Sequence, residues 1–215
     1  MKSYILILNI FLFINCQTNQ HKEKYSEYTE KKLEKVTFGG GCFWCLSPCF
    51  EMIKGVNKVT SGYSGGYNDY PTFQQVSSGL TDHAEVIQIE YDPEYISFSE
   101  ILDIFWFLHD PTQLNRQGID IGSQYRSIIL YRNEEQKILS QESLKKSQST
   151  DLWKGKYVTQ IVPFVNFFPA EDFHQEYYQK NPSHPYCISV IAPKIEKFRT
   201  KFNYKLKPEF KRIIK

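Results

Sequence analysis

The sequence has no block of basic residues, no internal repeat and no GxGxxG motif, and each absence excludes a class of protein. Its 26 Lys and Arg against 24 Asp and Glu leave a net charge of only +2, spread along the chain, so nothing favours a nucleic-acid partner. An apolar run long enough to cross a bilayer comfortably is also missing. What the 215 residues do contain is a high aromatic content, with 16 Phe, 15 Tyr and 3 Trp, which suits a core or pocket built from rings.

The N-terminus differs from the rest of the chain. A short basic start leads into an apolar stretch from Tyr4 to Ile14, the pattern of a signal peptide. The stretch resembles a bacterial lipoprotein signal, in which a cysteine, here Cys16, becomes the acylated first residue. We therefore expect a signal segment at 1–16, a polar tether at 17–34 and one domain at 35–215, exported to the cell envelope and attached to the membrane through Cys16. A plain secretory signal or an uncleaved anchor is the alternative.

Strand and helix patterns alternate, which predicts a mixed α+β domain with helices packed on a sheet. The clearest strand, Ala84 to Tyr91, places Ile87 and Ile89 on one face with Glu85 at the head of that row. Ser97 and Glu100 form a capping box that predicts a helix to about residue 109. The other predicted elements are strands at 35–38, 59–63, 124–131 and 157–165, helices at 43–54 and 133–149, and a loop-rich region from residue 167.

The cysteines carry the strongest chemical signal. Besides Cys16 there are Cys42, Cys45, Cys49 and Cys187, and three of these fall within eight residues. Such a cluster fits a zinc or iron–sulfur site, a CxxC redox motif, a nucleophile with resolving cysteines, or a structural disulfide in an exported protein.

The neighbours of Cys42 favour a nucleophile. Three glycines precede it and a helix is predicted to begin after it, so backbone N–H groups should lower the pKa of its thiol. Bulky Phe43 and Trp44 between Cys42 and Cys45 fit poorly between metal ligands, whose sulfurs must converge within about 4 Å around one ion. The two rings suit the wall of an apolar pocket beside the sulfur.

At this point the residues resemble a known family. Gly41-Cys42-Phe43-Trp44 is similar to the active-site signature of the A-type peptide methionine sulfoxide reductases. Similar segments follow in the family's order across about residues 34 to 200, which makes the match specific although each motif alone is weak: Ser61–Tyr67, Ser78–Glu85, Asp120–Ser127, Glu171–Gln175 and Asn181–Cys187.

The resemblance implies a ferredoxin-like core and a role for each site residue. Cys42 would attack the sulfur of methionine S-sulfoxide, in peptides or free, while Glu85 donates a proton to the departing oxygen. Tyr125 would hydrogen-bond that oxygen and Asp120 would organise the site. The rings of Phe43 and Trp44 would hold the methyl group.

The resemblance also implies how the enzyme is recycled. The sulfenic acid left on Cys42 must condense with a second thiol to form an intramolecular disulfide. Cys187 is the first candidate because its Tyr-Cys context resembles the family's resolving position on a flexible tail, and Cys45, three residues after Cys42, is the second. No cofactor is expected beyond a thioredoxin-like reductant, and the enzyme, which repairs oxidised proteins, is expected to be a monomer.

Two features limit this interpretation, and one alternative function rivals it. Phe73 stands where the family commonly has a tyrosine that helps bind the oxygen, so a hydrogen bond worth roughly 1 kcal/mol is absent or supplied elsewhere. No B-type reductase domain is recognisable, so we expect reduction of the S epimer only. The main alternative is a thiol–disulfide oxidoreductase that uses Cys42 and Cys45 and leaves Glu85 and Tyr125 without a role.

Overall fold

The computed structural model of the protein describes residues 32–211. The predicted signal segment with Cys16, and nearly all of the predicted tether, lie outside the described residues. None of the helices within 32–211 has the length and apolar character needed to cross a membrane.

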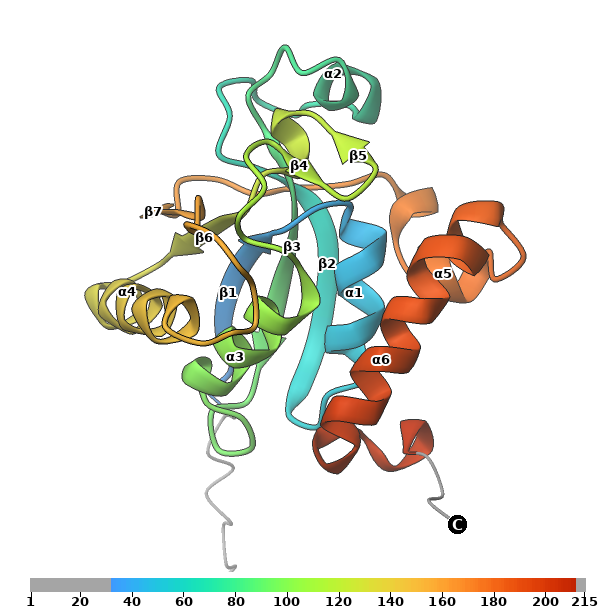
Figure 1. Cartoon of the computed structure of the whole chain (residues 1–215). Coiled ribbons are helices and arrows are strands. Elements are labelled where there is room, and N and C mark those ends of the chain that lie inside the picture. Colours follow the sequence, from blue (N-terminus) through green and yellow to red (C-terminus); the bar gives the residue numbers. More distant parts are fainter. Residues whose placement is uncertain (1–31, 212–215) are drawn as a thin grey trace, which may run out of the picture. The chain divides into compact units, whose positions relative to one another are not determined.

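A six-stranded sheet forms the centre of the domain (Figure 1). Its strand order is β7-β6-β1-β3-β2-β8, and all neighbours are antiparallel except β6 and β7. The strands are β1 (Glu34–Gly39), β2 (Val56–Ser64), β3 (Ala84–Tyr91), β6 (Ile128–Tyr131), β7 (Gln160–Pro163) and β8 (Phe168–Pro169). With α1 (Phe43–Glu51) and α3 (Phe98–Leu108), strands β1, β2, β3 and β6 follow the β-α-β-β-α-β order of a ferredoxin-like core, as predicted.

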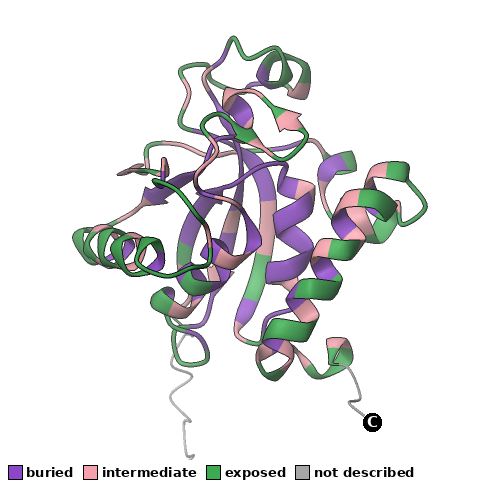
Figure 2. Ribbon diagram, in the orientation of Figure 1, coloured by how far each residue is buried: buried purple, intermediate pink, exposed green. Residues whose placement is uncertain are grey.

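Helices α1 and α3 cover the same face of the sheet. Phe38 of β1 stacks on Phe105 of α3 with ring centroids 4.6 Å apart and lies 6.4 Å from Phe50 of α1. Figure 2 shows α1 buried along most of its length beside the buried strands. A smaller apolar cluster on the other face joins Val86 and Ile128 to residues after β7. Reducing contact with water on both faces drives the packing of these layers.

The local sequence signals for β3 and α3 are confirmed. β3 spans the predicted residues, with Ile87 and Ile89 fully buried and Glu85 in the same row. Both hydrogen bonds of the Ser97–Glu100 capping box are present, and α3 ends one residue before His109. Helix α4 (Glu134–Gln148) also lies where it was predicted, with Asn133 as its N-cap.

Other boundaries were wrong. The predicted strand at 124–131 begins only at Ile128, because Ser123–Tyr125 is a 3-10 turn, and the strand predicted at 157–165 shortens to β7. Helix α1 ends at Glu51 rather than Lys54.

The region from residue 167 is more helical than predicted. It contains α5 (Tyr177–Lys180), a π-helical turn (Cys187–Ile191) and the eleven-residue α6 (Ala192–Phe202). Helix α6 tolerates Pro193 because this residue lies in its first turn, where proline is readily accommodated. The remaining short elements are α2 (Phe73–Ser77), β4 (Arg116–Gln117), β5 (Asp120–Ile121) and 3-10 turns at Asp172–His174, Asn203–Lys205 and Pro208–Phe210.

Candidate active site

Cys42 occupies the N-cap of α1, immediately after the glycines that follow β1. Gly41 has a φ of +91° and donates its N–H to the carbonyl of Tyr125 at 3.1 Å. A Cβ on Gly41 would lie 2.6 Å from Cγ of Gln117, so both the backbone angle and the space require glycine here. Cys42 is buried, with 8% of the residue exposed.

Glu85 lies directly beside this helix start. Its Oε2 accepts the backbone N–H of Phe43 at 3.1 Å, and the side chain is only 2% exposed. Burial is the largest cause that raises the pKa of Glu85, to about 8, while the Phe43 N–H opposes it. The carboxyl is therefore mainly protonated at neutral pH and holds a proton that it could donate.

The pKa of the Cys42 thiol differs from the prediction. Burial is the largest cause that raises the pKa of this thiol, and the contacts with Cys45 and Glu85 add to the increase. The N–H of Trp44 lowers the pKa, as a helix N-terminus should, but by less. The resting Cys42 is thus a protonated thiol. The prediction failed because it counted the helix N–H groups and left out the cost of desolvating a buried thiolate.

Cys45 is the more acidic thiol of the pair. Its N–H donates to the carbonyl of Cys42 at 2.9 Å, and the side-chain hydrogen bond with Cys42 is the main cause that lowers its pKa to about 7. Burial opposes this shift, while Lys194 of α6 and the hydroxyl of Tyr186 support it. Cys45 is therefore present as both thiol and thiolate near neutral pH.

Aromatic rings form one wall beside the sulfurs. Trp44 stacks face to face on Tyr177 at 3.6 Å between centroids, and Phe43 lies 5.2 Å from the ring of His174. Phe43 is 1% exposed whereas Trp44 is half-buried, so the wall reaches from the core to the surface. Such a wall can hold a methyl group by apolar contact, but its ring faces offer no hydrogen-bond donor to an oxygen.

Tyr125 and Asp120 come from the loop and short strand that face α1. Burial raises the pKa of Tyr125, and the charges of Glu85 and Cys42 add to the shift, so its hydroxyl stays protonated near both groups. Asp120 accepts a 2.7 Å hydrogen bond from the hydroxyl of Tyr186, and burial raises its pKa as well. The fold thus gathers Tyr125 and Asp120 around the reactive cysteines.

Three residues of this region were not predicted to take part in the site: Tyr186, His174 and Glu171. Tyr186 links Asp120 to Cys45, whose sulfur lies 3.4 Å from the hydroxyl. Glu171 accepts hydrogen bonds from Tyr63 and from the backbone of Phe73. All three stand in the segments that resembled the family, but no spacing rule connects them to residues so far away in sequence.

Phe73, the residue at which the sequence predicted a missing hydroxyl, contributes its ring to the aromatic wall. Its ring centroid lies 4.6 Å from that of His174, so the side chain packs on the aromatic wall. Both ring nitrogens of His174 are buried without a hydrogen bond among the described residues, and burial lowers its pKa, which keeps the ring neutral.

The other cysteines are buried. Cys49 is fully buried one turn after Cys45, and burial raises the pKa of its thiol, as expected for an inert core cysteine. Cys187 begins the π-helical turn and is also fully buried, not on a flexible tail. Burial raises its pKa, and the next cause is the charge of Cys45, which lies near it. The four cysteines within residues 32–211 are free thiols.

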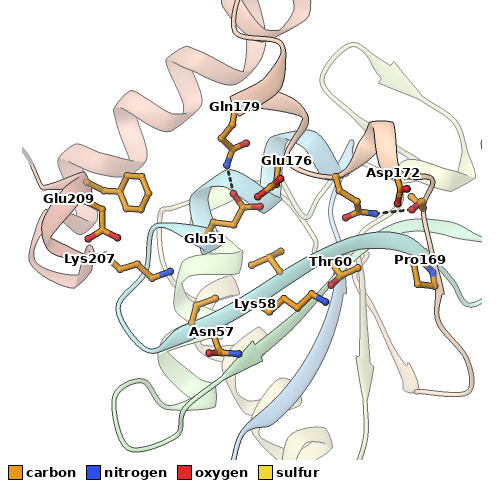
Figure 3. A pocket seen from close by; sticks show the side chains of 15 residues that line it. Glu51, Asn57, Lys58, Thr60, Pro169, Asp172, Glu176, Gln179, Lys207 and Glu209 are labelled. Atoms are coloured by element: carbon orange, nitrogen blue, oxygen red, sulfur yellow. Dashed lines mark hydrogen bonds between the residues drawn. The ribbon is translucent and has the colours of Figure 1, made fainter.

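A separate groove runs along β2 between the end of α1 and the residues after α6 (Figure 3). Gln179 donates a hydrogen bond to Glu51 across it, and Lys58 and Lys207 approach it from other segments. No catalytic candidate lines this groove. In the part of the chain that the structure describes, no three His, Cys, Asp or Glu side chains converge closely enough to bind a metal ion.

Known proteins share these features. The family profile "Peptide methionine sulfoxide reductase" matches residues 34–206. Peptide methionine sulfoxide reductase MsrA of Acinetobacter baumannii (strain AYE) is 49% identical over 175 residues, covering 81% of this chain and 99% of that protein. MsrA of Nautilia profundicola is 51% identical over 166 residues, covering 77% of this chain and 94% of that protein.

A solved structure supports the same relationship. Mxr1 from Saccharomyces cerevisiae in its reduced form superposes with a TM-score of 0.67 at 32% identity, covering 76% of this chain and 94% of that one. The matched residues include Cys42, Glu85, Asp120 and Tyr125, whose geometry is described above. The chain therefore belongs to the peptide methionine sulfoxide reductase family, and it is an enzyme that reduces methionine sulfoxide.

Proposed function

We propose that the enzyme reduces the S epimer of methionine sulfoxide, in peptides and as the free amino acid, with Cys42 as nucleophile and Glu85 as proton donor. The observation that carries this proposal is the buried Glu85 carboxyl, held beside Cys42 by the N–H of Phe43. Breaking a sulfoxide S–O bond requires a proton donor at this position, because the oxygen is otherwise a poor leaving group, whereas thiol–disulfide exchange can proceed without one.

The first step balances with the protons that these residues hold. The Cys42 sulfur attacks the sulfoxide sulfur, and the sulfoxide oxygen takes the proton of Glu85. The S–O bond of the substrate breaks as the hydroxyl passes to the Cys42 sulfur, and methionine leaves as the thioether. Cys42 is oxidised to the sulfenic acid as the sulfoxide is reduced, and the thiol proton of Cys42 returns to Glu85, with which it shares a hydrogen bond. The carboxyl therefore ends the step protonated. The hydroxyl of Tyr125 donates a hydrogen bond to the sulfoxide oxygen and stabilises the charge that develops on it.

The aromatic wall gives the epimer preference its physical basis. Phe43 and Trp44 accept the methyl group on one side of the sulfur, while Glu85 and Tyr125 accept the oxygen on another. Exchanging the two substituents, as in the R epimer, would place the oxygen against rings without a donor and leave the polar groups unpaired, at a cost of about 1–3 kcal/mol for each.

Cys45 is proposed to resolve the sulfenic acid. It shares a hydrogen bond with Cys42 and has the lower pKa, whereas Cys187 is fully buried in a helical turn. These contacts favour Cys45 over Cys187, the reverse of the order suggested by sequence. The product is a Cys42–Cys45 disulfide and one water molecule. An external dithiol of the thioredoxin type would reduce that disulfide by thiol exchange, and no other cofactor is needed.

The proposal is tested by turnover of a peptide that carries S-methionine sulfoxide, with dithiothreitol as reductant. Wild type should form methionine, Cys42→Ser should not, and the R epimer should remain. Activity in Cys42→Ser would overturn the assignment of the nucleophile. If wild type reduced insulin disulfides but not the sulfoxide, the oxidoreductase alternative would replace this proposal.

We further propose that the enzyme is exported as a monomer and anchored in the cell envelope through a lipid on Cys16. The signal pattern of residues 1–16 supports the anchor, and the site residues of a single chain support the monomer. Labelling with a radioactive fatty acid should mark wild type but not Cys16→Ser, and the variant should leave the membrane fraction. Equal labelling of both proteins would exclude acylation at Cys16.

A further inference from the structure

Three side chains from distant parts of the sequence form a continuous chain of contacts. The Cys45 sulfur lies 3.4 Å from the hydroxyl oxygen of Tyr186, and that hydroxyl lies 2.7 Å from Oδ2 of Asp120. The ring of Tyr186 is held edge-on to Trp44, with centroids 6.3 Å apart. Tyr186 therefore stands between a reactive sulfur and a carboxylate, in a position fixed by the aromatic wall.

The hydroxyl proton decides the direction of these contacts. A tyrosine hydroxyl has one proton, and in Tyr186 it is donated to Asp120. The oxygen of Tyr186 is left to accept the S–H of Cys45 while that thiol is protonated, and the hydroxyl stabilises the thiolate once the proton has left. Burial raises the pKa of Tyr186, so this hydroxyl does not ionise at neutral pH and works only by passing a proton on.

The role of Cys45 in the proposed function makes this chain useful. A thiol must lose its proton as its sulfur attacks, because the thiolate is the nucleophile. Cys45 is fully enclosed, with 3% of its surface exposed, so bulk water does not easily receive that proton. Among the described residues, the hydroxyl of Tyr186 is the side-chain oxygen that lies within hydrogen-bond distance of the Cys45 sulfur.

We propose that Tyr186 is a catalytic residue of the disulfide-forming step, and that it passes the proton of Cys45 to Asp120. The Cys45 sulfur bonds to the Cys42 sulfur and the S–OH bond of Cys42 breaks. The Cys45 proton moves to the Tyr186 oxygen while the Tyr186 proton moves to Asp120. The leaving hydroxide takes the proton of Glu85 and departs as water. Cys45 is oxidised and the sulfenic sulfur of Cys42 is reduced. Asp120 gains one proton and Glu85 loses one, so the step that yields the disulfide and water is balanced.

Other charged and titratable groups also face Cys45 and set its behaviour with pH. Cys42 and Glu85 lie on the substrate side, Cys49 in the next turn of α1, and Cys187 and Lys194 on the segments packed against α1. Lys194 stabilises a thiolate at Cys45 and so assists the same step. Burial raises the pKa of Asp120, which makes its carboxylate a better proton acceptor.

The inference rests on Cys45 as the resolving thiol, and its test separates the two reactions. Enzyme without reductant is mixed rapidly with excess S-sulfoxide peptide, and both methionine formation and loss of free thiols are followed. In Tyr186→Phe, methionine and the first thiol loss, at Cys42, should appear at nearly the wild-type rate, while loss of the second thiol, which marks the disulfide, should slow roughly a hundredfold. Asp120→Asn should slow loss of the second thiol similarly. Tyr204→Phe, at an exposed tyrosine, should change neither rate.

The pH profile distinguishes a proton path from a merely structural contact. The Tyr186 hydroxyl lowers the pKa of Cys45. In Tyr186→Phe, the rate of disulfide formation should therefore rise with the ionisation of Cys45, and the pH midpoint of that rise should lie above the wild-type midpoint. Loss of the second thiol in Tyr186→Phe at the wild-type rate and with the same midpoint would overturn the inference. So would unchanged loss of the second thiol in Cys45→Ser, which would assign resolution to another cysteine. Absence of methionine formation in wild type would instead refute the proposed function.

Discussion

The backbone N–H of Phe43 donates a 3.1 Å hydrogen bond to Oε2 of Glu85, and this bond joins the start of α1 to the head of β3. Without burial, such a bond would favour an ionised carboxylate. Here burial outweighs it, and the pKa of Glu85 rises to about 8. The same contact thus fixes the acid next to Cys42 while the surrounding core keeps it protonated.

Glu85→Gln should remove the proton donor without removing the acceptor of the Phe43 N–H. We expect the first turnover to slow roughly a hundredfold. Wild-type activity should be lost as the pH rises through about 8, because the protonated carboxyl disappears there, and the residual activity of the variant should lack this decline. Rapid-quench measurements between pH 6 and 9 test this. Glu90→Gln, on the polar face of the same strand, is the matched control.

The same substitution should stabilise the fold. The folded state holds a proton on Glu85 that the unfolded chain gives up above its ordinary pKa near 4.5, so burial of Glu85 costs more stability as the pH rises from 4.5 to about 8. Glutamine does not ionise. We expect Glu85→Gln to raise the free energy of unfolding by on the order of 3 kcal/mol at pH 7 and by little near pH 4.5. Urea unfolding at both pH values would show it, and an equal effect at both would contradict the burial argument.

Cysteine variants should separate the two proposed thiols. Without reductant, Cys45→Ser should form methionine once per enzyme. It should keep turnover with dithiothreitol, which can attack the sulfenic acid directly, but lose turnover with thioredoxin. Cys187→Ser should still lose two thiols per methionine formed. Thiol titration and peptide mapping after one turnover provide the measurement. A Cys42–Cys187 disulfide in wild type would restore the order that the sequence suggested.

Local patterns predicted those parts of the fold that local physics decides. The alternation in β3 and the Ser97–Glu100 box depend on residues within one element, and both are confirmed. The strand expected to start at Gln124 failed because its first residues turn to place Tyr125 in the site. The α6 helix was missed because Pro193, like the prolines before it, was interpreted as a loop signal.

The site followed the same division. Cys42 and Glu85 could be found from a helix start and a strand row. Tyr186 could not, since its partners Cys45 and Asp120 are 141 and 66 residues away, and only the folded chain brings them together. The pKa order of the two thiols was also beyond the sequence, because desolvation depends on what packs around each sulfur.

Gly41→Ala should destabilise the protein through both strain and contact. A φ of +91° is unfavourable for alanine, and its Cβ would overlap the Gln117 side chain. Gly79→Ala is the matched control, because Gly79 has a φ of +73° but nothing within 4 Å of an added Cβ. We expect a loss of about 1 kcal/mol for Gly79→Ala and at least about 2 kcal/mol for Gly41→Ala in urea unfolding. Equal losses would mean that Gln117 moves aside freely.

Phe73→Tyr tests whether the site has room for the tyrosine hydroxyl that the family resemblance predicts at this position. The ring already packs on His174, whose two nitrogens are buried without a hydrogen bond among the described residues, so a new hydroxyl enters a region with an available partner. A hydrogen bond to the sulfoxide oxygen worth roughly 1 kcal/mol net should raise kcat/KM about fivefold. The increase should be absent for Phe173→Tyr, an exposed neighbour of the same wall. A fall in kcat/KM of Phe73→Tyr would show that the hydroxyl binds His174 or Glu171 in place of the substrate, and that this chain has replaced the family's oxygen contact by other means.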